Sequence, residues 1–231
     1  MITVFDDAYI QTKKVKQGAS HMNPEMVPLA DWMLKKYGVA PLNIIYTNTL
    51  NAGERTRTIE IIFEYCEQQK LFLENQFVLK GAIKKKILKF FKWNIDVRSE
   101  NKLLNWLLKP LPYFKNEPLV TSSSFMPLAI EEANSNISDE DIQLLKKQIA
   151  EIEIWRIVRN STHAIFFFYT ESNLKEFDNS AFKEKLSLKY FPLIKKYDEY
   201  NYITVYSISI CLDSKENFDK KYGSNWFYYL R

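Results

Sequence analysis

The stretch IWRIVRNSTHAIFFFY, residues 154–169, decides the fold class because it contains two β-rich runs joined by turn residues. β-Branched and aromatic residues dominate positions 154–159 and 163–169, as is typical of strands. The intervening Asn-Ser-Thr at 160–162 consists of residues that favour tight turns. The stretch therefore predicts two neighbouring strands connected by a turn.

A second hairpin is predicted nearer the N-terminus. Residues 42–50 and 56–65 are β-rich and flank the sequence NAGE at 51–54, which is typical of a hairpin turn. Further strands are predicted at residues 95–97, at 202–212 and, as a strand or a docked tail, at 226–231.

Helices are predicted where apolar residues recur every three or four positions. These segments are residues 5–17, 24–37, 77–92, 101–108, 138–152, 180–197 and 213–222. Pro192 is expected to kink or divide the helix in which it lies. Hairpins with helices between them predict an α+β fold, mainly antiparallel sheet with helices packed on its faces.

Residues 110–137 separate two such groups of elements. They contain four prolines and a Thr-Ser-Ser-Ser run at 121–124, which is typical of a linker or a functional loop. We therefore expect an N-terminal α+β half at 1–109 and a C-terminal α+β half at 138–231, with one fused domain as the alternative.

Short matches between the two groups suggest an internal repeat. Phe63 aligns with Phe167 at an offset of 104 residues, and Lys80 aligns with Lys185 at an offset of 105. Both groups have the predicted order β-β-α-β-α, so two related halves are one hypothesis. Chance identity between unrelated α+β segments is the alternative, because such segments readily share a few residues.

The residue types that carry most enzyme chemistry are scarce. The chain has two histidines, two cysteines and five glycines, whereas aromatic residues make up 15% of it. General acid-base catalysis, metal sites and phosphate-binding loops draw on the scarce types. His163 follows Ser161 and Thr162, but neighbours in a turn seldom adopt catalytic geometry, so a structural histidine is expected. No catalytic residue, metal site or cofactor is predicted.

Carboxylates leave one enzymatic alternative open. Glu60 and Glu64 share a face of the predicted strand, and Glu67 follows them. A carboxylate-dependent hydrolase or nuclease uses such groups to hold a metal ion. A polar strand face is the more common explanation of this pattern.

Positive charge is concentrated in one segment. The formal net charge is +4, and residues 80–109 hold nine Lys or Arg against two acidic residues. Lys85, Lys89 and Lys92 share one side of the predicted helix, as in helices that bind nucleic acid. A solvated helix face has the same pattern, so at most weak, sequence-independent contact with nucleic acid is expected.

The C-terminus carries the densest aromatic cluster. Trp226, Tyr228 and Tyr229 are predicted to bind a partner, because Trp and Tyr dominate the energetics of protein interfaces. Together with the loop at 110–137, they form the predicted binding surface. Burial of the aromatics against a sheet is the alternative.

The chain is expected to be a non-catalytic, cytoplasmic protein-binding protein. Acidic Asp6 and Asp7 argue against a signal peptide, and no apolar run is long enough to cross a membrane. Cys66 and Cys211 lie in apolar runs and are expected to be buried and unpaired. The partner is expected to be another protein, with a bacterial toxin-neutralising, immunity-type role as the most specific form and a homodimer as an alternative.

The segment before Met22 needs a separate interpretation. Residues 18–22, of sequence GASHM, are typical of the remnant of a cloning site. The helical pattern at 5–17 and the glycine that follows it favour a native segment.

Overall fold

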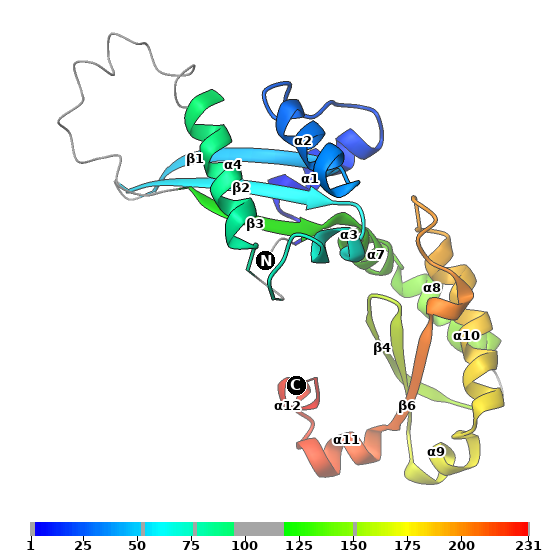
Figure 1. The fold of residues 1–231 in the computed structure, drawn as a ribbon. Coiled ribbons are helices and arrows are strands. Elements are labelled where there is room, and N and C mark those ends of the chain that lie inside the picture. The colour runs from blue at the N-terminus through cyan, green and yellow to red at the C-terminus, as the bar shows by residue number, and fades with distance from the viewer. Residues whose placement is uncertain (1–2, 52–53, 76–77, 95–117, 150–151, 231) are drawn as a thin grey trace. The chain divides into compact units, whose positions relative to one another are not determined.

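The structure, a computed structural model, describes residues 3–51, 54–75, 78–94, 118–149 and 152–230. The chain divides into two compact units, Met1–Leu128 and Ala129–Arg231. Each unit has a three-stranded sheet with helices packed against it (Figure 1). The predicted α+β class is therefore confirmed.

The first sheet contains β1 (Asn43–Asn51), β2 (Glu54–Phe63) and β3 (Leu119–Ser124), in that order. β1 and β2 form the predicted hairpin, with Asn51 opposite Glu54. β2 and β3 run parallel, and Phe63 lies opposite Ser124 at their shared end. β2 is the central strand, and its neighbouring residues Ile61 and Ile62 are buried on opposite faces of the sheet.

Four helices of the first unit are α1 (Asp7–Lys16), α2 (Val27–Tyr37), α3 (Cys66–Lys70) and α4 (Gly81–Asn94). Met33 of α2 and Ile87 of α4 pack with Ile61 in one buried core. α1 lies on the other face, since Asn43, which pairs with Ile62, donates a hydrogen bond to Thr12. The sheet is thus covered on both faces, as a central apolar strand requires.

The second sheet contains β4 (Ile154–Asn160), β5 (His163–Phe168) and β6 (Ser209–Ser214), in that order. The hairpin predicted from residues 154–169 is confirmed, and Ser161 takes a left-handed conformation in its turn, with φ of 53°. β5 and β6 run parallel. Each sheet therefore has one antiparallel and one parallel pairing, a smaller antiparallel share than the sequence suggested. The third strand returns through intervening helices and so enters in parallel.

Helices of the second unit include α8 (Asp139–Gln148), α9 (Glu171–Phe177), α10 (Ser180–Lys195), α11 (Lys215–Tyr222) and α12 (Trp226–Tyr229). α10 buries Phe182, Leu186, Tyr190 and Ile194, four residues apart along one side of the helix. Pro192 lies inside α10 without dividing it.

Among the described helices and strands, both sheets have the order β-β-α-α-β, and a helix follows each third strand. Phe63 and Phe168 each lie opposite the last serine of a parallel partner strand, Ser124 or Ser214. The structure therefore equates Phe63 with Phe168, at an offset of 105, and the alignment at 104 is wrong by one residue. Lys80 precedes α4, so its match to a residue within α10 is also wrong.

The prediction of a loop at 110–137 is wrong for most of the residues that the structure describes in this range. β3 and helix α7 (Phe125–Ser135) occupy it, and the Ser-rich run forms an outer strand of the first sheet. Pro127 lies in the first turn of α7, where proline is tolerated. The division between the units falls inside α7. The strand and helix predicted at 95–97 and 101–108 lie outside the described residues.

Two predictions near the C-terminus are also corrected. Only Ser209–Ser214 of the predicted strand at 202–212 is a strand, and Val205–Ser207 forms a turn of 3₁₀ helix. Local side-chain hydrogen bonds hold that turn and override the alternating apolar pattern. Residues 226–229 form the short helix α12, so the strand alternative is wrong, whereas the docked-tail alternative is confirmed by the contact of Trp226 with Phe167 of β5.

Candidate protein-binding surface

A groove of about 340 Å³ lies beside β6 in the second unit. Its walls come from α10 and from the segment that leads into β6. The lining residues are Lys183, Glu184, Ser187, Leu188, Val205, Tyr206, Ile208 and Ile210. Leu188 is 57% exposed and Tyr206 is 95% exposed. The groove therefore presents large apolar side chains to solvent.

β6 is an outer strand of its sheet, and the groove follows it. The Ser209 N–H donates to the Thr162 carbonyl, so the backbone groups of Ser209 point toward β5. Because successive residues alternate, the N–H and C=O groups of Ile210 and Leu212 point away from β5. No other strand of the described chain pairs with that side. β6, of sequence SICLDS, also lacks the lysine or proline that often blocks an open edge.

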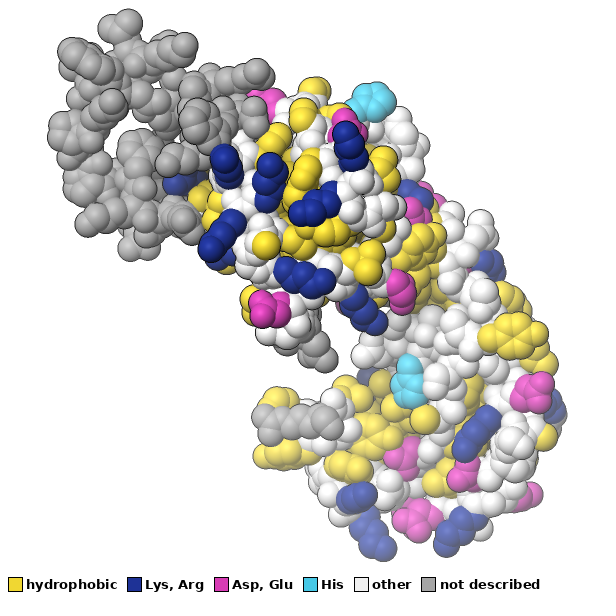
Figure 2. Space-filling model, in the orientation of Figure 1, with side chains coloured by type: hydrophobic (Ala, Val, Ile, Leu, Met, Phe, Trp, Pro, Cys, Tyr) yellow, Lys and Arg dark blue, Asp and Glu magenta, His cyan; other side chains and the backbone are white. Residues whose placement is uncertain are grey.

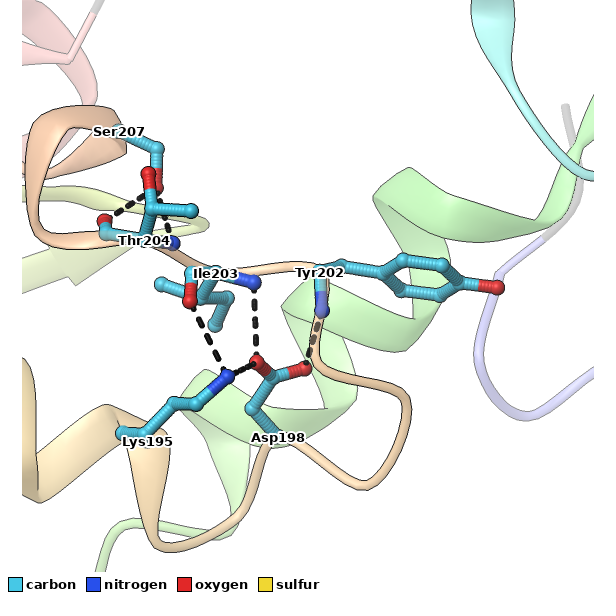
Figure 3. Close-up of polar contacts among 6 residues, drawn as sticks. All are labelled: Lys195, Asp198, Tyr202, Ile203, Thr204 and Ser207. Atoms are coloured by element: carbon cyan, nitrogen blue, oxygen red, sulfur yellow. Dashed lines mark hydrogen bonds and ion pairs between the residues drawn. The ribbon is translucent and has the colours of Figure 1, made fainter.

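A buried carboxylate holds the groove wall that carries Tyr206 (Figure 3). Asp198, whose side chain is 3% exposed, accepts hydrogen bonds from the backbone N–H groups of Tyr202 and Ile203, at 3.0 and 2.9 Å. Lys195 pairs with the same carboxylate at 2.7 Å and also donates to the Ile203 carbonyl. This network fixes the backbone of the segment that precedes Tyr206.

The next turn of the segment is fixed in the same way. The Ser207 hydroxyl accepts from the Thr204 N–H at 3.1 Å and donates to the Thr204 carbonyl at 2.7 Å. Tyr206 lies between these two residues. Its exposure thus arises in an anchored turn, where the Ser207 side chain holds the backbone of Thr204.

The predicted partner-binding residues of the C-terminus fall into two groups. Trp226 stacks on Phe218, with 4.1 Å between ring centroids, and Tyr229 donates to the Asp213 carboxylate at 2.6 Å. Burial and the negative charge of Asp213 raise the pKa of Tyr229. Tyr228 is 59% exposed. Trp226 and Tyr229 are therefore part of an aromatic cluster, and Tyr228 alone of the three is largely accessible.

The predicted basic patch lies on α4. Lys85 and Lys89 are exposed, on the side opposite Ile83 and Ile87, which are buried. Lys92 belongs to the same helix, but its side chain lies outside the described part. Figure 2 shows Lys and Arg side chains spread over the face of the first unit that carries α4. The lysines thus form the solvent side of an amphipathic helix.

The three glutamates of the hydrolase alternative have different surroundings. Glu60 is half-buried on β2, and this burial raises the pKa of its carboxyl group. Glu64 pairs with Lys16 at 2.7 Å, and Glu67 is exposed on α3. Within the described ranges, no three His, Cys, Asp or Glu side chains group closely enough to hold a metal ion.

The cysteines are free, but the predicted burial is wrong. Cys66 begins α3 and is half-buried, with its Sγ 3.2 Å from the Ser124 Oγ. Cys211 lies on the outer strand β6 and is exposed. The prediction was wrong because β2 ends at Phe63, before Cys66, and because an outer strand leaves one side of Cys211 uncovered.

Sequence reasoning missed the groove. Leu188 carried a signal, because it lies on the opposite side of α10 from Leu186 and Tyr190, which are buried. A single exposed apolar residue is common on protein surfaces, so this signal alone does not identify a contact residue. Tyr206 carried none, because its position matched the pattern of the predicted strand at 202–212.

Comparison with protein-family models, curated proteins and solved structures gives no match for this chain. No described helix is long and apolar enough to cross a membrane.

Proposed function

We propose that the chain is a non-catalytic protein-binding protein that holds a segment of its partner in the groove beside β6. The observation that carries the proposal is the exposure of Leu188 and Tyr206 beside an open strand edge. Tyrosine is among the residues that contribute most to protein interfaces, and an open edge offers backbone hydrogen bonds to an extended segment. The two unpaired cysteines fit a reducing compartment such as the cytoplasm.

A toxin-neutralising, immunity-type role is the specific form of this proposal. Such a role requires surface contacts with one protein and no catalytic group in this chain. The groove offers contacts of this kind, since its lining combines apolar side chains with the polar groups of Lys183, Glu184 and Ser187.

Photo-crosslinking from inside the groove tests the proposal. A benzophenone amino acid at position 188 is expected to link the chain to one protein in extracts of its host. The matched control places the same group at position 144 on α8, where Leu144 is 55% exposed. Equal labelling from both positions, or none from position 188, would contradict the proposal.

A further inference from the structure

The outer edge of β4 forms a second hollow, on the opposite side of the sheet from β6. Its volume is about 310 Å³. Asn134 and Ser135, at the end of α7, line it together with Arg156, Ile157, Val158 and Arg159 of β4. Unlike the groove beside β6, this hollow is bordered by two arginines.

Arg159 is fixed by backbone carbonyls. Its guanidinium group donates to the carbonyl oxygen of Asn134 at 2.9 Å and to that of Ile137 at 3.5 Å. No carboxylate in the described part of the chain forms an ion pair with it. The Tyr190 hydroxyl is a further partner of Arg159. A guanidinium has five N–H donors, so these contacts still leave donors for a ligand.

Arg156 is fixed by an aromatic ring. Its guanidinium carbon lies 4.7 Å from the ring centroid of Trp226, and the residue is exposed. It too has no ion pair among the described residues. A cation–π contact occupies none of the N–H donors of the guanidinium with an acceptor atom, so these groups can donate to a carboxylate.

Lys146 adds a third positive charge at the same edge. Its Nζ donates to the Trp155 carbonyl at 2.7 Å. Burial and the positive charge of Arg156 lower the pKa of Lys146, and Glu153 opposes this shift. The cations at this edge are thus held by carbonyls and a ring, and their combined charge attracts an anionic group.

The backbone of β4 favours an extended ligand. Asn160 and His163 flank a two-residue turn, so they form a hydrogen-bonded pair. By alternation, the backbone N–H and C=O groups of Ile157 and Arg159 point to the outer side. The two arginines are three residues apart, so their side chains leave β4 on opposite faces of the sheet, roughly 10 Å apart along the strand. A small ion does not span both, whereas the alternating side chains of an extended peptide reach both faces.

We propose that the outer edge of β4 binds an extended acidic peptide, with carboxylates at Arg156 and Arg159. Backbone pairing would place the peptide along the strand, and charge-assisted hydrogen bonds would select acidic side chains. This site does not depend on the groove beside β6.

Fluorescence anisotropy of a labelled hexaglutamate peptide tests the proposal at low ionic strength. Arg156→Gln is expected to weaken binding about tenfold, and Arg156→Lys by less, because lysine keeps the charge but loses the planar donor pair. Lys220→Gln, which removes an exposed charge from α11, is the matched control and is expected to change binding less than twofold. Tyr206→Ala in the β6 groove is expected to leave binding unchanged.

Several outcomes would overturn the proposal. Equal weakening by Arg156→Gln and Lys220→Gln would mean that net charge alone attracts the peptide. Displacement by inorganic phosphate at equal carboxylate and phosphate concentrations would indicate a small-anion site. Binding of a single-stranded oligonucleotide that is tighter than that of the peptide and depends on Arg156 would indicate a nucleic-acid site. If the hexaglutamate peptide does not bind, the arginines serve only to block pairing of other strands with this edge.

Discussion

Tyr229 donates its hydroxyl hydrogen to the Asp213 carboxylate across 2.6 Å and thereby fastens α12 to the end of β6. Asp213 is buried and also accepts from the side chain of Asn217 and the backbone N–H of Ser214. Because the pKa of Tyr229 is raised, its hydroxyl stays a donor throughout the physiological pH range. The C-terminal aromatics thus contribute to the stability of the second unit.

Tyr229→Phe is expected to lower the free energy of unfolding by about 1–3 kcal/mol, because it removes a hydrogen bond to a buried carboxylate. Urea denaturation measures the change. Tyr228→Phe is the control, since Tyr228 is largely exposed and its change is expected to stay within about 0.5 kcal/mol. Equal losses in the two variants would contradict this account of the Asp213 contact.

Glu60→Gln is expected to stabilise the chain at pH 7. Burial raises the pKa of Glu60 in the folded state above its ordinary value of 4.5, so the folded state binds the proton more tightly than the unfolded state does. Ionisation at neutral pH therefore costs stability, and this cost disappears as the pH falls to 4.5 and below. The gain from Glu60→Gln should shrink over the same range.

Urea denaturation of Glu60→Gln at pH 7 and pH 4.5 measures this effect. Glu67→Gln on α3 is the control, because Glu67 is exposed. A gain that stays constant with pH, or a loss at pH 7, would show that Glu60 is not destabilised by its burial.

Asp198→Asn is expected to loosen the wall of the groove. The amide can accept fewer of the hydrogen bonds from Tyr202, Ile203 and Lys195, and bonds to a charged group are worth about 1.5–3 kcal/mol each. Hydrogen exchange at the Tyr202 and Ile203 amides should accelerate. Asp178→Asn, which breaks an exposed pair with Lys183, is expected to have little effect on either amide.

The lysines of α4 are expected to give weak binding to nucleic acid that falls steeply with salt. The double variant Lys85→Ala and Lys89→Ala should reduce the affinity and also the dependence of the affinity on salt concentration. With fewer phosphate contacts, fewer counterions are released when the nucleic acid binds. Titration with a labelled oligonucleotide at several salt concentrations measures this. Binding that is selective for nucleotide sequence and persists at high salt would contradict the prediction of weak binding.

The fold was predictable where the determinants are local. The hairpin at 154–169 combines β-forming residues with a tight turn, and Ser138 begins α8 by accepting from the Asp141 N–H. β3 was not predictable, because Ser122 and Ser123 pair with residues about 60 positions earlier and have weak strand propensity of their own. Parallel pairing of this kind leaves no local pattern in the chain.

The candidate site was predictable only in part. The sequence predicted that the aromatic residues Trp226, Tyr228 and Tyr229 bind a partner. Residue type alone does not distinguish a buried ring from an exposed one. Leu188 and Tyr206 form an accessible surface because the fold places both beside the same groove and leaves both side chains exposed. Such a surface depends on tertiary packing, which residue type and spacing do not specify.

The affinity of the crosslinked partner for two tyrosine variants tests the central claim most directly. Tyr206→Ala is expected to weaken binding by about 2 kcal/mol, or roughly 30-fold, because Tyr206 lies in the groove. Tyr228→Ala, at the exposed position of the C-terminal tail, is expected to change the affinity less than about threefold. A large loss in Tyr228→Ala with none in Tyr206→Ala would contradict the claim and assign binding to the tail.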